Sequence, residues 1–111
     1  MDAHARMLAL FDEGGAGMRA LLAKRENAIA ASLAEVLREG PDTHYDECAC
    51  AYAAAVQQQR CARLIVDAAA HVRTHATNKQ LIEASYQRAR ADCESATILV
   101  GLCARRMAVA Q

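Results

Sequence analysis

The fold is decided by residues 82–107, which read IEASYQRARADCESATILVGLCARRM. Apolar or small side chains recur along this stretch at alternating steps of four and three residues. We call these positions the seam residues: Ile82, Tyr86, Ala89, Cys93, Ala96, Val100, Cys103 and Met107. This spacing places them on one face of a helix, and it is typical of helices that pack side by side along their length.

The same spacing continues towards the N-terminus, as far as residue 61. The further positions are Cys61, Ile65, Ala68 and Val72, followed by the polar residues His75 and Lys79. Residues 43–109 therefore form either one helix of about 100 Å or two helices joined by a turn near residues 73–79. The rarity of very long helices favours the hairpin, whereas the absence of glycine and proline near residues 73–79 favours one helix.

Two more helices are expected before residue 43, over residues 3–12 and 18–39. The segment Gly14-Gly15-Ala16-Gly17 separates them, because three glycines in four residues interrupt a helix. Gly40-Pro41 ends the second helix, since proline cannot continue its hydrogen bonds. Charged residues mark the polar side of residues 18–39: Lys24, Arg25, Glu26, Glu35, Arg38 and Glu39.

These patterns predict an all-α protein with one domain over residues 1–111. It is an elongated antiparallel helical bundle or coiled-coil hairpin of three to four helices. Of the 111 residues, 54% belong to apolar types, but 27 of them are alanine. A chain with so few large apolar side chains depends on close helix packing and suits a partner surface beside it.

The composition also bears on location. The net charge is zero, with five Lys and Arg against nine Asp and Glu in residues 1–59 and eight against four in residues 60–111. The N-terminus lacks the pattern of a signal peptide, and the apolar run over residues 96–104 is too short to insert into a membrane. Five cysteines, an odd number, indicate reduced thiols. We therefore expect a cytoplasmic protein.

Catalytic and nucleic-acid motifs are weak in this chain. The segment Gly14-Gly15-Ala16-Gly17 is not followed by the Lys-Ser or Lys-Thr of a phosphate-binding loop, and no strand is expected before it. Four arginines near the C-terminus, Arg88, Arg90, Arg105 and Arg106, are spread too widely for a recognition helix. The sequence predicts no enzyme, no cofactor and no nucleic-acid partner.

Metal binding is an alternative, because the chain has five Cys and four His. His44 and Cys48 are one helical turn apart, and so are His71 and His75, so each pair can face a common ion. Cys61, Cys93 and Cys103 fall in apolar positions, where a free thiol behaves as a small hydrophobe. We predict no metal, and we keep a helical metal-binding bundle that uses the two pairs as the alternative.

Residues 78–101 resemble part of a known protein family. The chain reads Asn78-Lys79-Gln80-Leu81-Ile82, then Tyr86, then Ile98-Leu99-Val100-Gly101, which resembles the C-terminal helix of FlgN-type export chaperones. Residues 21–25 with Leu33 resemble the N-terminal helix of that family. The chain departs from the family at His75, where a second Asn is common.

The resemblance implies a cytoplasmic chaperone that binds a helical segment of a flagellar or type III export substrate. By position it assigns substrate contact to Leu81, Ile82, Tyr86, Ile98 and Leu99. The charge pattern adds Arg88 and Arg90 at the rim, where they attract an acidic segment. The sequence thus predicts a helical protein-binding module, and a structural coiled-coil oligomer is a second alternative.

Overall fold

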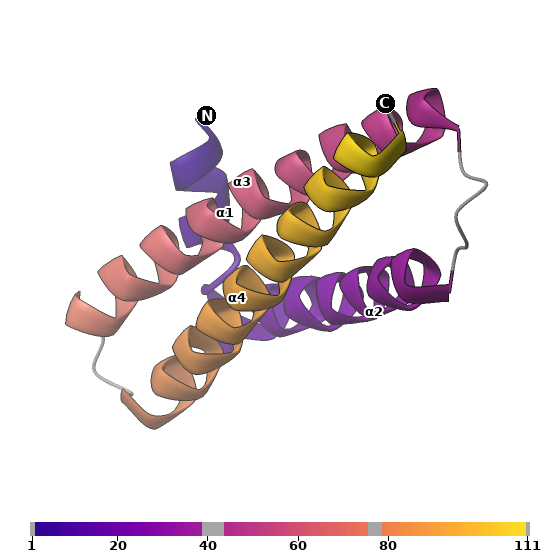
Figure 1. Cartoon of the computed structure of the whole chain (residues 1–111). Coiled ribbons are helices and arrows are strands. Elements are labelled where there is room, and N and C mark those ends of the chain that lie inside the picture. Colours follow the sequence, from indigo (N-terminus) through magenta and orange to yellow (C-terminus); the bar gives the residue numbers. More distant parts are fainter. Residues whose placement is uncertain (1, 39–43, 76–78, 111) are drawn as a thin grey trace.

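The computed structural model describes residues 2–38, 44–75 and 79–110, and every regular element in them is helical (Figure 1). The helices are α1 (Ala3–Ala9), α2 (Ala16–Arg38), α3 (Tyr45–His75) and α4 (Lys79–Ala110), with a single turn of 3-10 helix, η1, at Glu13–Gly15. The molecule is elongated, measuring 52 × 25 × 17 Å. The predicted all-α bundle is confirmed.

The long helical region is a hairpin. Helices α3 and α4 lie side by side and run in opposite directions, and α2 packs across α4 (Figure 1). Helix α3 ends at His75 and α4 begins at Lys79, so the break falls within the predicted interval of residues 73–79. Residues 76–78 themselves lie outside the described part of the chain, as does the predicted stop at Gly40-Pro41.

The glycine segment makes a sharp turn between α1 and α2. Glu13, Gly14 and Gly15 have φ angles of 57°, 79° and 78°, a left-handed conformation that glycine adopts without strain. Helix α1 therefore ends at Ala9, three residues before the predicted end, and α2 already begins at Ala16. The amide of Met18 donates to the carbonyl oxygen of Leu10 at 2.9 Å, which holds the two sides of the turn together.

Small side chains set the register between α3 and α4. Buried small residues recur every seven positions on both helices and fall in the same three core clusters: Ala69 and Ala89, Ala62 and Ala96, and Ala55 and Cys103. All six are at most 2% exposed. Side chains of this size permit closer contact between helix backbones than leucine does. The alanine-rich composition thus has a structural role at this interface.

The buried face of α4 differs slightly from the predicted seam. Ala89, Ala96 and Cys103 are buried as expected, whereas Ile82, Tyr86, Cys93, Val100 and Met107 are half-buried. The other buried positions are Ser85, Asp92 and Leu99, each one residue before a seam position. The face is rotated because α4 contacts both α2 and α3. A charged residue in that face was not expected.

Candidate functional site

A buried charged network joins the three long helices. Arg25 of α2 is 6% exposed, so its assignment to the polar face of residues 18–39 was wrong. Its Nε donates to Oδ2 of Asp92 on α4 at 2.8 Å. Its two terminal nitrogens donate to the side-chain and backbone oxygens of Gln58 on α3, at 2.8 and 2.7 Å. A buried guanidinium is tolerated because carboxylate and carbonyl oxygens satisfy its donors.

One carboxylate oxygen of Asp92 has no hydrogen-bond donor among the described residues. Its Oδ1 atom is buried and receives no hydrogen bond from the described residues. Asp92 also contributes to the lining of a hollow of about 180 Å³ between α2 and α4. The remaining lining residues are Glu26, Ile29, Ala30, Leu33, Ala91 and Ser95. This hollow is mostly apolar, and its lining includes the buried carboxylate of Asp92 and the exposed one of Glu26.

A second hollow lies on the other side of α2, where α2 faces α3. It has a volume of about 210 Å³, and we call it the α2–α3 groove. Its lining comes from three helices: Ser32, Glu35 and Val36 of α2; Ala51, Ala54, Ala55 and Gln58 of α3; and Leu99 and Cys103 of α4. Both hollows flank the second half of α2, where no residue after Ile29 is buried.

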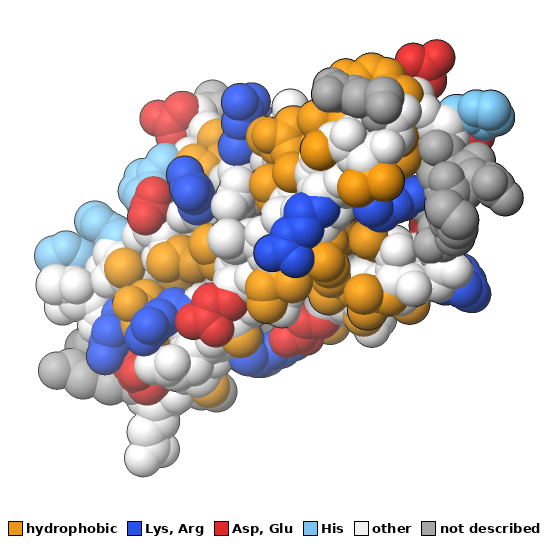
Figure 2. Space-filling model, in the orientation of Figure 1, with side chains coloured by type: hydrophobic (Ala, Val, Ile, Leu, Met, Phe, Trp, Pro, Cys, Tyr) orange, Lys and Arg blue, Asp and Glu red, His pale blue; other side chains and the backbone are white. Residues whose placement is uncertain are grey.

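Three of the exposed large apolar side chains lie near helix ends. Leu37 near the end of α2, Tyr45 at the start of α3 and Val109 near the end of α4 are 72%, 40% and 81% exposed. Figure 1 shows the start of α3 beside the end of α4, with the end of α2 on the same side of the molecule but apart from them. In Figure 2, hydrophobic side chains over the second half of α4 and the adjacent part of α2 are interrupted by Lys and Arg.

The predicted partner-binding residues are divided between core and surface. Ile82 and Tyr86 are half-buried and pack on the core beside η1, and Leu99 is 2% exposed in the core at the other end. Ile98 is 59% exposed. The side chain of Leu81 lies outside those described, as does Asn78 of the family resemblance. The structure does not bring this set together on one surface.

The two predicted rim arginines have partners within the chain. Arg88 donates from Nε and Nη2 to the two carboxylate oxygens of Glu26, at 3.2 and 2.5 Å. This hydrogen bonding holds the pKa of Glu26 below its ordinary value and raises the pKa of Arg88. The guanidinium carbon of Arg90 lies 6.0 Å from the centre of the Tyr86 ring, and that of Arg73 lies 4.4 Å from it. Tyr86 is thus covered by two cations.

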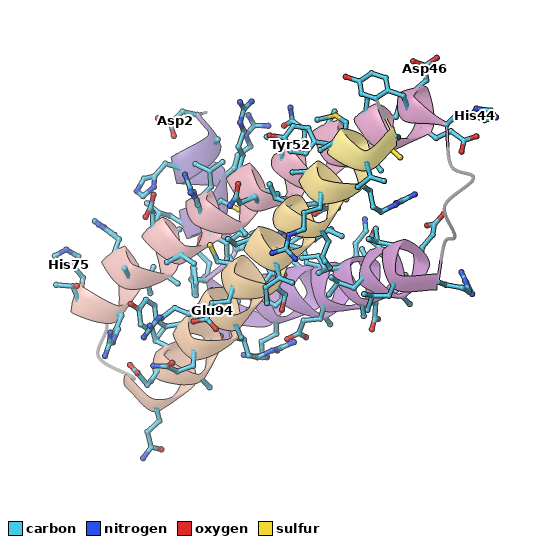
Figure 3. All side chains as sticks on the ribbon, viewed as in Figure 1. Asp2, His44, Asp46, Tyr52, His75 and Glu94 are labelled. Atoms are coloured by element: carbon cyan, nitrogen blue, oxygen red, sulfur yellow. The ribbon has the colours of Figure 1, made fainter. Side chains whose placement is uncertain are left out.

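The four candidate metal ligands fall at opposite ends of α3. Cys48 and His71 are separated by 23 residues of helix, or about 35 Å. Figure 3 shows His44 and His75 at opposite ends of the molecule. Cys48 is 1% exposed, whereas His44 is exposed. As they stand, no three His, Cys, Asp or Glu side chains of the described residues are arranged to hold a metal ion.

The five cysteines are free thiols in different surroundings. Cys48 and Cys103 are buried, Cys61 and Cys93 are half-buried, and Cys50 is exposed. Burial raises the pKa of the Cys103 thiol, and the neighbouring Cys48 raises it further. A thiol with a raised pKa is a poor nucleophile and a poor metal ligand at neutral pH. Cys103 therefore serves as a small packing residue opposite Ala55.

Sequence reasoning missed the Arg25 network and the α2–α3 groove. The residues of the network are 33 and 67 positions apart in sequence, so no local pattern connects them.

No helix in the described segments is both long and apolar enough to cross a membrane. Comparison of the chain with protein-family models, curated proteins and solved structures finds no match.

Proposed function

We propose that this protein is a non-enzymatic binding module whose α2–α3 groove receives an amphipathic helix of another protein. The observation that carries the proposal is the groove itself, an apolar hollow between helices at the end where Leu37, Tyr45 and Val109 are exposed. A helix placed in such a groove is a common mode of protein recognition, and it would complete a four-helix bundle.

The lining residues define the chemistry of the partner helix. Ala51, Ala54 and Ala55 give α3 a flat wall that permits close approach of a second helix, and Leu99 forms an apolar floor. Glu35 is the charged residue of the lining, with Gln58 as a polar neighbour. The matching ligand is a helix with an apolar row and a Lys or Arg beside it, facing Glu35.

The resemblance to FlgN-type chaperones supplies the biological class of this partner. On that reading, the groove holds a helical segment of a flagellar or type III export substrate in the cytoplasm until export. The role in export rests on the sequence resemblance of residues 78–101. The groove supports the more general role of helix binding.

Two adjacent alanines of α3 give a matched test. Ala53 and Ala54 are both exposed, but only Ala54 is among the residues that line the groove. Purified export substrates with predicted terminal helices are titrated into the wild-type protein, Ala54→Trp and Ala53→Trp, with binding measured by calorimetry. We expect Ala54→Trp to weaken binding at least about tenfold, equivalent to about 1.4 kcal/mol, and Ala53→Trp to leave it unchanged.

The outcomes separate the parts of the proposal. Equal affinities for the two variants would remove the groove as the binding site. Failure of every export substrate to bind the wild-type protein would remove the chaperone role. A stable homo-oligomer in light scattering that is indifferent to these substrates would instead favour the structural coiled-coil alternative.

A further inference from the structure

A second row of positions on α4 faces solvent. Its members follow one another at alternating steps of three and four residues, and all of them are exposed: Ala91, Glu94, Ile98, Gly101, Arg105 and Ala108. We call these positions the outward row. Ile98, near its centre, is 59% exposed. In Figure 1, none of the described helices lies in front of this part of α4. The outward row therefore has the spacing of a coiled-coil seam, but no helix in the described part of the chain packs against it.

The outward row is complementary to itself when two copies of α4 run in opposite directions. With a two-fold axis beside the midpoint of residues 99 and 100, each position of the row faces another position of the same row in the second copy. The facing positions are Ile98 with Gly101, Glu94 with Arg105, and Ala91 with Ala108. A large apolar side chain thus faces the smallest residue, an acid faces a base, and alanine faces alanine.

The two charged positions decide the direction of such a pair. Glu94 and Arg105 are both exposed, and neither pairs with another side chain among the described residues. In a parallel dimer each of them would lie beside its own copy, so like charges would meet. In the antiparallel dimer each meets the opposite charge. This charge complementarity favours a second copy of the chain, in the antiparallel direction, as the occupant of the outward row.

Gly101 gives the approaching helix room. A Cβ built at Gly101 meets nothing within 4 Å, so the side chain of Ile98 from a second copy can reach the backbone there. Two apolar side chains beside the row extend the contact: Leu102 is half-buried and Val109 is 81% exposed. No position of the outward row lines the α2–α3 groove.

We propose that this protein forms an antiparallel homodimer in which the outward rows of two α4 helices pack against each other. The α2–α3 groove stays open in this dimer, so the inference does not depend on the proposed helix binding. Each copy contributes one large apolar side chain to the centre of the contact. The interface is therefore small, and we expect a reversible dimer with a Kd in the micromolar range.

Sedimentation equilibrium of the full chain at about 1–300 μM measures the Kd of the dimer. We expect Ile98→Asp to weaken dimerisation at least about tenfold, because a carboxylate then loses water at the centre of the contact. Leu37→Asp is the matched control, since Leu37 is 72% exposed but lies on α2, and it should leave the Kd unchanged. Circular dichroism confirms that both variants are folded.

A charge exchange tests the facing of Glu94 and Arg105. Glu94→Lys and Arg105→Glu each place like charges opposite one another, and each should weaken dimerisation about threefold or more. When the two variants are mixed, they should associate with each other about as tightly as the wild-type protein does. In that mixed dimer the introduced lysine faces the introduced glutamate, and the native Arg105 faces the native Glu94. Glu47→Lys and Arg63→Glu, at exposed positions of α3, are the controls.

The outcomes that would overturn the dimer are distinct from those that test helix binding. A protein that stays monomeric up to the highest concentration would overturn it, as would a Kd unchanged by Ile98→Asp. A dimer weakened by Ala54→Trp but not by Ile98→Asp would place the second copy in the α2–α3 groove instead. Single charge variants that dimerise as tightly as the wild-type protein would refute the antiparallel facing. Because the groove stays open, the proposed dimer binds export substrates, whereas a purely structural oligomer does not.

Discussion

At the scale of single residues, the ion pair between Arg25 and Asp92 connects α2 and α4 through the core. Both side chains are almost completely buried, and Arg25 also reaches Gln58, so one guanidinium connects α2, α3 and α4. Removal of one partner leaves an uncompensated charge in the core. The position of α2 on the hairpin therefore depends on this network.

Asp92→Ala is accordingly expected to lower the free energy of unfolding by about 3–5 kcal/mol, a large part of the total for a small domain. The double variant Arg25→Met with Asp92→Leu should recover most of this loss, because it removes both charges and fills the space with apolar side chains. Urea unfolding followed by circular dichroism measures both effects. A cost below about 1 kcal/mol for Asp92→Ala would contradict the burial of the pair.

The exposed ion pair of Glu26 and Arg88 should contribute less to the free energy of unfolding than the buried pair of Arg25 and Asp92. Their side chains are 43% and 36% exposed, and solvent screens such pairs, so Glu26→Gln should cost less than about 1 kcal/mol. Because Arg88 lowers the pKa of folded Glu26, the contribution is present at neutral pH. It fades as the pH falls below the ordinary glutamate pKa of about 4.3 and is lost once the pH passes the lowered folded pKa.

Urea unfolding of the wild-type protein and Glu26→Gln at pH 7 and at several values below pH 4 checks this sign. The difference between the two proteins should shrink as the solution becomes more acidic. A difference that grows with acidity would contradict the assignment of the lowered pKa to the Arg88 contact.

At the scale of the elements, two glycines in different conformations give opposite expectations. Gly101 lies inside α4, and a Cβ built there meets nothing within 4 Å. Gly14 also has open space around it, but its φ of 79° suits glycine alone. A Cβ has room at both positions, so the backbone conformation decides whether replacing the glycine with alanine stabilises or destabilises the fold.

Gly101→Ala should raise the free energy of unfolding by about 0.5–1 kcal/mol, because alanine loses less backbone entropy in a helix. Gly14→Ala should lower it by about 1 kcal/mol or more, because the left-handed conformation strains an alanine. The urea midpoints of the two variants measure this contrast. Shifts in the same direction would mean that the turn at η1 rearranges without cost.

The helices themselves were largely predictable from sequence. The glycine segment and the apolar spacing located the helices at residues 3–12 and 18–39 within a few residues, because helix formation depends on neighbours one turn away. The sequence did not decide between one long helix and a hairpin, because no glycine or proline occurs near residues 73–79. Its stability comes from burial of small residues on both helices, such as Ala62 and Ala96, which the turn itself does not encode.

At the scale of the whole molecule, the core is uneven along its length. Helix α3 has buried residues from Cys48 to Ala69 and α4 from Ser85 to Cys103, whereas α2 has no buried residue after Ile29. The second half of α2 lies between two hollows. This part of α2 is supported by less packing than the α3–α4 hairpin.

Hydrogen exchange should therefore be slowest in the hairpin and faster in the second half of α2. We expect amides of residues 32–38 to exchange at least about tenfold faster than those of residues 58–69, because local opening there exposes little apolar surface. Mass spectrometry of peptic fragments measures the two segments in one experiment. Equal protection would show that α2 opens only together with the whole domain.

The sequence by itself determined the helices, most of their limits and, to within a rotation of one residue, the inward side of α4, because these depend on a local period of backbone hydrogen bonds. Only the tertiary structure decided that Arg25 is buried, that Leu99 lies in the core, and that His4 approaches His71. Each of these depends on the rotation and register of one helix against another. The packing of small side chains such as Ala62 and Ala96 sets that register, and no single helix contains the information.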